Sequence, residues 1–287
     1  MKKGIIMTNK TNTSRVWLIT GAGRGLGRAF AQEAIDHGDC VIAGVRRMPE
    51  NDPLFKNERL LAVKMDVTDK EQVADAVKKG VDQFGRIDIL INNAGFGLNG
   101  ALEEISIEEL RRLFETDYFG LVQVTQAVLP VMRGQKGGRI LNVASQSGLI
   151  AGAGTSAYNA VKFAVVGLTE ALNLEMAPWG IEAMVVCPGP FRTDFRDASS
   201  AMRPGNLMPE YDGTPAHDLL NYLDENNHTQ SGDPAKAAAV VYKIATAERM
   251  PGRLALGSTC TAGYERFLKA QLEELSSYRD LSGATDF

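Results

Sequence analysis

Short apolar runs alternate with segments of helical periodicity along most of the chain. Between residues 69 and 84, for example, Val73, Ala76, Val77 and Phe84 fall on one side of a helix. Strands separated by helices predict a parallel sheet covered on both faces, because parallel strands need long crossover connections. We therefore expect a single α/β domain, a doubly wound (Rossmann) fold around a seven-stranded parallel sheet. The expected strands are 15–20, 40–45, 60–65, 87–91, 139–144, 182–187 and 253–257.

A long helix is predicted from Ser106 to about Met132. Ser106 and Glu109 have the spacing of a capping box, in which each side chain bonds to the other residue's backbone N–H. Pro130 is expected to kink the helix near its end, because proline cannot donate the helical hydrogen bond.

The two ends of the chain and one internal segment stand apart from this pattern. Residues 1–13 are polar with only a short apolar stretch, and we expect a disordered leader ahead of a catalytic domain at 14–287. The segment 192–232 has little regular pattern but many apolar side chains, which favours a lid over the site; two short surface helices are the alternative. A terminal helix is expected at 263–278.

Composition narrows the function classes. Apolar residues make up 44% of the chain and charged residues 23%, with a net charge of −4 and no basic run, which argues against nucleic-acid binding. Cys40, Cys187 and Cys260 are far apart and fit neither a zinc site nor a disulfide framework, so we expect no metal and a reducing, cytoplasmic location. No apolar run approaches the ~18 residues of a membrane span.

A glycine-rich turn joins the first strand to the first helix. The run Thr20–Gly27 reads TGAGRGLG. Glycines let the backbone approach a pyrophosphate, and the N-terminus of the following helix offers free N–H groups. A tight turn that merely needs positive φ is the alternative, but both flanks favour dinucleotide binding. The candidate cofactor-binding residues in this turn are Gly21, Gly23, Arg24, Gly25, Leu26 and Gly27.

The end of the second strand indicates which dinucleotide binds. A site for NAD(H) usually has an acidic residue there for the ribose 2′-hydroxyl. Here Val45 is followed by Arg46 and Arg47, and Arg24 could converge on the same point. Guanidinium groups suit a 2′-phosphate, so we expect NADP(H) rather than NAD(H). A solvated strand end is the alternative.

Acid/base chemistry is indicated by three residues near the fifth strand. Ser145 follows that strand, and Tyr158 and Lys162 are four apart on the next helix, on one face. A free phenol titrates near pH ~10, and a lysine cation beside it favours the phenolate. A Tyr–Lys pair alone is a weak motif, but polar or glycine-bearing segments follow the ends of several strands. In a parallel sheet these ends meet at one edge, where ligands bind.

Taken together, these residues resemble the short-chain dehydrogenase/reductase family. The matching pieces are the glycine turn, Asn92-Asn93-Ala94-Gly95, Ser145 at 13 residues before Tyr158, Tyr158-x-x-x-Lys162, and Pro188-Gly189 with Thr193. The resemblance covers roughly residues 14–260, and within the family the chain looks most like hydroxysteroid or retinol dehydrogenase-like members.

The resemblance implies a role for each matching residue. Tyr158 would be the general acid/base, Lys162 would lower its pKa and hold the nicotinamide ribose, and Ser145 would orient the substrate oxygen. Asp66 would bind the adenine and Thr193 the carboxamide. The other implied cofactor contacts are Val67, Asn93, Ala94, Gly95, Pro188 and Gly189.

One residue departs from the family pattern. The long helix carries Asp117 where the family usually has Asn, whose main chain helps to hold a water next to the lysine. An ionised Asp117 would stabilise the Lys162 cation and offset part of its effect on Tyr158. We expect a working enzyme with a less acidic Tyr158; weakened catalysis is the alternative.

The substrate side is expected to be apolar. Phe96, Gln146, Leu149 and Phe191 adjoin catalytic or cofactor segments and are the candidate substrate-binding residues. They favour a fairly bulky ketone or secondary alcohol as the small-molecule substrate. His217 and His228 lie in the lid segment, where solvated or capping roles are expected.

We therefore predict an NADP(H)-dependent ketone reductase or alcohol dehydrogenase. The alternatives are a non-catalytic NADP(H)-binding regulator or scaffold and, less favoured, an epimerase or dehydratase. The family resemblance also implies a homodimer or homotetramer. Apolar stripes on the helices at 106–132 and 156–177 could mediate self-association, or could face the core.

Overall fold

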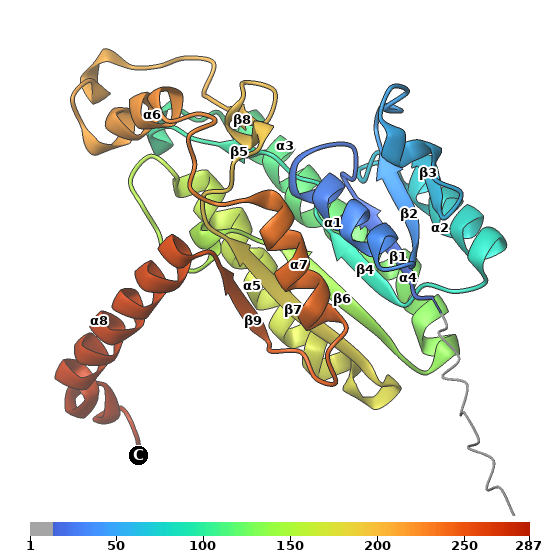
Figure 1. Ribbon diagram of the computed structural model, residues 1–287. Coiled ribbons are helices and arrows are strands. Elements are labelled where there is room, and N and C mark those ends of the chain that lie inside the picture. Colours follow the sequence, from blue (N-terminus) through green and yellow to red (C-terminus); the bar gives the residue numbers. More distant parts are fainter. Residues whose placement is uncertain (1–13) are drawn as a thin grey trace, which may run out of the picture.

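A computed structural model describes residues 14–287, so the expected leader lies outside the described residues. Seven parallel strands form the central sheet in the order β3-β2-β1-β4-β6-β7-β9 (Figure 1). Their bounds are β1 Val16–Thr20, β2 Cys40–Val45, β3 Leu60–Lys64, β4 Ile89–Asn92, β6 Gly138–Val143, β7 Ile181–Pro188 and β9 Arg253–Leu256. The expected fold class is confirmed.

Helices cover both faces of this sheet. On one face are α1 (Gly25–Asp36) and α7 (Pro234–Ala245); on the other are α2 (Lys70–Phe84), α4 (Leu121–Gln135) and α5 (Ser156–Met176). Alternate strand residues serve the two faces: Trp17 and Ile19 join the first core, and Val16 and Leu18 join the second. This alternation explains the continuous apolar runs in the sequence, since a strand that is buried on both faces needs apolar side chains at every position.

The predicted helix at 106–132 is wrong as a single regular helix. It consists of α3 (Ile107–Phe114), a π-helical turn at Glu115–Gly120, and α4. Ser106 and Glu109 form the expected capping box. At the far end of the π turn, a Cβ atom on Gly120 would lie 2.6 Å from Cγ2 of Val67, so this turn packs tightly against the loop after β3.

The segment 192–232 is more regular than the sequence pattern predicted. It contains α6 (Pro215–Glu225) and β8 (Ala201–Met202), and β8 forms a small parallel sheet with β5 (Gly97–Leu98). In Figure 1 this segment gathers at the end of the molecule where β5 lies. Short 3-10 turns complete the described fold at Pro53–Lys56, Leu102–Glu104, Gln146–Gly148, Ala177–Trp179, Asp194–Arg196 and Pro209–Tyr211.

The terminal helix is longer than the predicted 263–278. It is α8, Ser258–Gly283, and it starts directly after Gly257, whose φ of +93° suits glycine. None of the helices in residues 14–287 combines the length and the hydropathy that a membrane-spanning segment requires.

Candidate active site

The glycine turn and the loop after β4 are joined at the carboxyl edge of the sheet. The Thr20 hydroxyl accepts hydrogen bonds from the N–H groups of Asn93 and Ala94, both at 2.9 Å. Two glycines permit this contact: Gly21 has φ +65°, and a Cβ atom on Gly27 would lie 2.3 Å from the Gly21 carbonyl oxygen. These residues therefore hold the turn in one shape against its neighbour.

The N-terminus of α1 is open toward this turn. Arg24 occupies the N-cap position in an extended conformation without a side-chain cap, and the first turn of α1 carries no acidic residue. Free N–H groups and the positive end of the helix dipole favour a phosphate at this position. The local geometry thus fits the pyrophosphate of a dinucleotide, as the sequence predicts.

The arginine side chains near the turn have different surroundings. Arg24 donates hydrogen bonds to the hydroxyl groups of Ser199 (2.9 Å) and Ser200 (2.5 Å), so it connects the turn to the lid segment. Its expected convergence with Arg46 on a 2′-phosphate stays a prediction. Arg46 and Arg47 are exposed just after β2.

Other expected cofactor contacts lie along the same edge. The Asp66 carboxylate follows β3 and accepts hydrogen bonds from the backbone and hydroxyl of Thr68, at 3.0 and 2.8 Å. Thr193 faces the glycine turn, because a Cβ atom on Gly25 would lie 3.5 Å from the Thr193 Cβ. Pro188 ends β7, and Gly189 follows it beside Gln146. Each of these segments follows the end of a strand or of the glycine turn, at the same edge of the sheet.

Ser145, Tyr158 and Lys162 meet at the end of β6. Tyr158 and Lys162 are 7% and 5% exposed on the inward face of α5. The Lys162 ammonium lies 5.5 Å from the centre of the Tyr158 ring and donates a 3.3 Å hydrogen bond to the Val143 carbonyl. The Ser145 side chain is close enough to the Tyr158 phenol to lower its pKa. The three residues of the predicted acid/base set are thus adjacent.

Asp117 completes this group from the π-helical turn. It is 1% exposed, its Oδ2 lies 2.9 Å from the Lys162 ammonium, and its Oδ1 accepts a 3.0 Å hydrogen bond from the Phe96 N–H. A Cβ atom on Gly95 would lie 2.7 Å from Oδ2, so the loop after β4 can approach the carboxylate only because glycine stands there. Asp117 therefore connects the lysine to the loop that carries Phe96.

Burial and charge compete in setting the pKa of Tyr158. Burial is the largest effect and raises this pKa; Lys162 lowers it, Asp117 raises it, and the Ser145 side chain lowers it. The net pKa is raised, so the expected lowering by Lys162 is present but outweighed by burial. Asp117 acts in the direction expected from the sequence.

The same competition between burial and charge sets the pKa values of Asp117 and Lys162, which form an ion pair. Burial raises the pKa of Asp117, and the Lys162 cation opposes that rise. Burial lowers the pKa of Lys162, but Asp117 and then Tyr158 outweigh it, so the pKa of Lys162 is raised. The lysine is therefore held in its charged form, which it needs in order to act on Tyr158.

The predicted substrate-binding residues are divided by the structure. Phe96 packs in the same apolar cluster as Tyr158, together with Leu98 and Met202. Leu149 is buried in a different apolar cluster, and Phe191 is partly buried against the core that includes residues of α1 and α7. Their roles in substrate binding stay predictions. Their sequence positions next to catalytic segments did not reveal which way the backbone turns them.

Phe195 is a site residue that sequence reasoning missed. Its ring centre lies 6.2 Å from that of Tyr158, and a Cβ atom on Gly97 would lie 3.5 Å from the ring. Phe195 comes from the lid segment and is 41% exposed. An aromatic residue two positions after the Thr193 motif was the available signal.

The lid segment is tied to the rest of the domain by a buried carboxylate. Glu104 accepts hydrogen bonds from the N–H groups of Ala101 and Met208, both at 2.8 Å, and pairs with Nε2 of His217 at 2.7 Å. His217 also pairs through Nδ1 with Asp212 at 3.0 Å. The expected solvated or capping role for His217 is therefore wrong, because tertiary contacts across 113 residues bury it.

His228 has a different setting from His217. It is exposed and pairs with Asp197 at 3.0 Å. Asp194, Asp197 and His228 have potential ligand atoms within 4.8 Å of one another, but the group is partly exposed and nothing else points to a bound ion.

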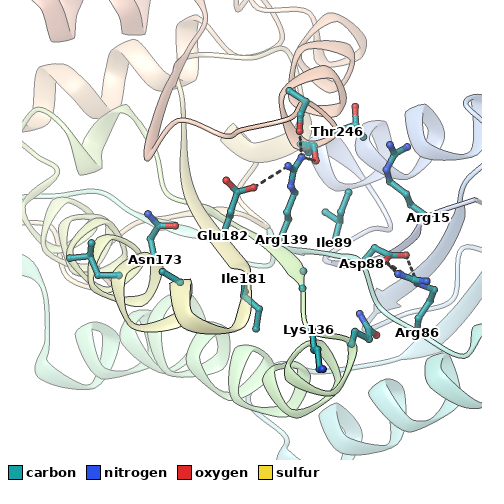
Figure 2. Close-up of a pocket in the computed structure, with 18 residues that line it drawn as sticks. Arg15, Arg86, Asp88, Ile89, Lys136, Arg139, Asn173, Ile181, Glu182 and Thr246 are labelled. Atoms are coloured by element: carbon teal, nitrogen blue, oxygen red, sulfur yellow. Dashed lines mark hydrogen bonds and ion pairs between the residues drawn. The ribbon is translucent and has the colours of Figure 1, made fainter.

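One cavity borders the sheet, and a second lies beside α1. The first, of about 850 Å³, lies where β4, β6 and β7 begin, at the other end of these strands from the acid/base group. Arg139 and Glu182 line it and form an ion pair at 3.0 Å (Figure 2). The second, of about 450 Å³, is lined by Gly25 and Thr193 and lies between α1 and the start of the lid. Ser145, Tyr158 and Lys162 line neither of these two cavities.

Comparison with known proteins now decides the family. The family model for short chain dehydrogenase matches residues 15–204. This chain belongs to the short-chain dehydrogenase/reductase family. The family match shows an oxidoreductase fold that binds nicotinamide cofactors.

Several members of the short-chain dehydrogenase/reductase family are similar over most of their length. The chain is 39% identical to Oxidoreductase BOA17 of Botryotinia fuckeliana, over 85% of this chain and 89% of the relative. It is 36% identical to 3-ketodihydrosphingosine reductase of Bacteroides thetaiotaomicron, over 85% and 88%. A short-chain dehydrogenase structure from Streptomyces avermitilis has a TM-score of 0.88 at 38% identity and covers 96% of this chain and 100% of its own.

The pair between His217 and Glu104 predicts a pH-dependent attachment of the lid. Hydrogen bonding with Glu104 is the main cause that raises the pKa of His217, whereas the pKa of Glu104 is lowered, because its hydrogen bonds outweigh the opposing effect of burial. The stabilisation by His217 is fully present below its unfolded pKa of ~6.5 and is lost as pH rises through the raised pKa. His217→Gln should lower the melting temperature at about pH 6 and have less effect at about pH 9.

His228→Gln is the matched control, because its exposed pair with Asp197 should contribute little at either pH. Thermal denaturation of both variants at the two pH values measures the difference. Equal losses for His217→Gln at both values would show that the charge on His217 does not hold the lid.

Proposed function

We propose that this protein is an NADP(H)-dependent oxidoreductase that interconverts a fairly bulky apolar ketone and its secondary alcohol. The observation that carries this proposal is the adjacency of Tyr158, Ser145 and the charged Lys162 at the sheet edge beside an open helix N-terminus. The relative named 3-ketodihydrosphingosine reductase is consistent with a ketone substrate.

The proposed residues of the cofactor site are those of the glycine turn, the loop after β4, Asp66 and Thr193. A bound nicotinamide supplies hydride transfer at its C4. Tyr158 holds the proton that moves to or from the substrate oxygen, and Ser145 orients that oxygen by hydrogen bonding. Lys162 supplies the positive charge that favours the phenolate form of Tyr158.

Apolar groups around Tyr158 support the proposed substrate class. Phe96, Leu98 and Met202 pack in its cluster, and Phe195 stands over its ring. Such a surface favours a substrate with an apolar body and one reactive oxygen.

The cellular setting and assembly are also part of the proposal. Cys187 and Cys260 are free and buried, which suits a reducing, cytoplasmic location. Self-association as a homodimer or homotetramer is supported by large apolar side chains left exposed on α5, among them Phe163 and Leu174.

The first test is Tyr158→Phe, assayed with NADPH and a panel of bulky ketones. Loss of the proton donor should lower kcat by about 10²–10⁴-fold while NADPH binding, followed by fluorescence titration, stays close to that of the wild type. A wild-type protein that binds NADPH but turns over none of the ketones would favour the non-catalytic regulator or scaffold. Unchanged kcat in Tyr158→Phe would contradict the assigned acid/base role.

A second test concerns the cofactor. Solved relatives include ElxO with NADP bound and a 3-ketoacyl-(acyl-carrier-protein) reductase complexed with NADH, so the preference has to come from local residues. Arg46→Ala should lower the ratio of kcat/KM for NADPH to that for NADH by about tenfold or more, since it removes a charge-assisted hydrogen bond to the 2′-phosphate. Arg266→Ala, on an exposed helix, is the control. An unchanged ratio in Arg46→Ala would refute the NADP(H) assignment.

A third test concerns Asp117. Asp117→Asn removes a negative charge that raises the pKa of Tyr158, so the tyrosine limb of the pH–rate profile should move to lower pH by about 1 unit. Glu115→Gln removes an exposed carboxylate from the same π-helical turn and should leave the limb in place. If the limb of Asp117→Asn does not move, Asp117 has no part in setting the acidity of Tyr158.

A further inference from the structure

The terminal helix α8 leaves the body of the protein after its first turns. Cys260 is buried, and Tyr264 accepts a 2.8 Å hydrogen bond from Arg253. From Leu268 onward every residue is exposed, and Figure 1 shows the helix pointing away from the sheet. With 26 residues at 1.5 Å per residue, α8 is about 39 Å long, so most of its length contacts nothing in this chain.

The exposed part of α8 carries an apolar stripe. Leu268, Leu272, Leu275, Tyr278 and Leu281 are each between 49% and 74% exposed. The spacing of three and four residues places Leu268, Leu272, Leu275 and Tyr278 along one side of the helix, whereas Leu281 lies about 180° around the helix from Leu272. Helices in water are stabilised chiefly by packing of such a face, so this stripe requires a partner.

The charges beside the stripe fit a second copy of the same helix. Glu265 lies seven residues before Leu272, and Arg279 lies seven residues after it, so all three occupy the same heptad position. In an antiparallel pair centred on Leu272, each Glu265 faces Arg279 of the second copy. A parallel pair would instead place Glu265 opposite Glu265 and Arg279 opposite Arg279, which is repulsive.

We propose that α8 is a self-association helix, which pairs antiparallel with α8 of a second copy around a two-fold axis at Leu272. The two-fold axis makes each contact occur twice, as an isologous interface requires. In this register Leu268 faces Ser276 of the second copy and lies one residue along from its Leu275, so the two leucines pack side by side at each end of the pair. The proposal is independent of the proposed enzymatic function.

A lipid surface fits α8 less well than a second copy. The side opposite the stripe carries Arg266 and Lys269 but also Glu273 and Asp280. Helices that lie on membranes usually have an excess of lysine and arginine on the polar face. Charge balance on this face therefore favours a protein partner.

Cysteine cross-linking tests the two-fold axis directly. Leu272→Cys places two thiols near the axis, and mild oxidation of the full-length protein should give a disulfide-linked dimer on a non-reducing gel. Arg266→Cys, on the opposite side of α8, is the matched control and should cross-link no more than the wild type. Absence of a cross-link in Leu272→Cys, or equal cross-linking in both variants, would overturn the proposal.

Charge reversal tests the antiparallel register. Glu265→Arg turns both facing pairs into like charges and should weaken the cross-linking of Leu272→Cys by about tenfold in rate. Arg279→Glu should act likewise, and the double variant should restore the rate because it restores both pairs. If the double variant cross-links no faster than either single variant, the proposed register is wrong.

A membrane partner would give a different result. Binding of the wild type to anionic vesicles, together with no cross-link in Leu272→Cys, would assign the stripe to a membrane.

Discussion

The pairing of a buried ammonium with a buried carboxylate is the interaction on which the candidate site depends. Removing one charged group from water without a partner costs several kcal/mol, and breaking a buried pair leaves the other charge uncompensated. Lys162 and Asp117 lie 2.9 Å apart with side chains that are almost fully enclosed. Asp117 therefore allows the protein to keep a charged lysine next to Tyr158 in a site that is largely shielded from solvent.

Several backbone features support that pair. The π-helical turn at Glu115–Gly120 carries Asp117, and Gly95 leaves room for its carboxylate. The hydrogen bond from Phe96 holds the second oxygen, so the same carboxylate contacts the lysine and positions the loop that contributes to the apolar side of the site. An asparagine could accept the hydrogen bond from the Phe96 N–H but could not neutralise the Lys162 cation. Asp117 keeps Lys162 more firmly in its charged form, and it also makes Tyr158 less acidic.

Much of the fold and of the polar site follows from short-range patterns. Strands buried on both faces, the capping box at Ser106, and the four-residue interval between Tyr158 and Lys162 depend on neighbours in sequence, and all three are present in the structure. The edge of a parallel sheet then brings Ser145 and the glycine turn together without further information. The sequence indicated part of the role of Asp117, because this residue is a carboxylate at a position where the family usually has the amide of asparagine.

The remaining features depend on contacts between distant segments. Nothing near residue 217 in the sequence indicates Glu104, and the pairing of β5 with β8 joins two strands of two residues each. Leu149 and Phe191 pack in two different apolar clusters, which their positions beside catalytic segments did not indicate. Gly120, at the end of the π turn, likewise packs against Val67, which is far from it in the sequence.

The central claim is that the ammonium of Lys162 makes Tyr158 a stronger acid. It is tested most directly by NMR titration of the Tyr158 phenol carbon, with ¹³C-labelled tyrosine, in the wild type and in Asp117→Asn/Lys162→Met, because Asp117 keeps the lysine charged in the wild type and the double variant removes both charges together. The account predicts that Tyr158 ionises at higher pH in the double variant, which lacks the ammonium. Titration of Tyr158 at the same pH in both proteins would contradict it.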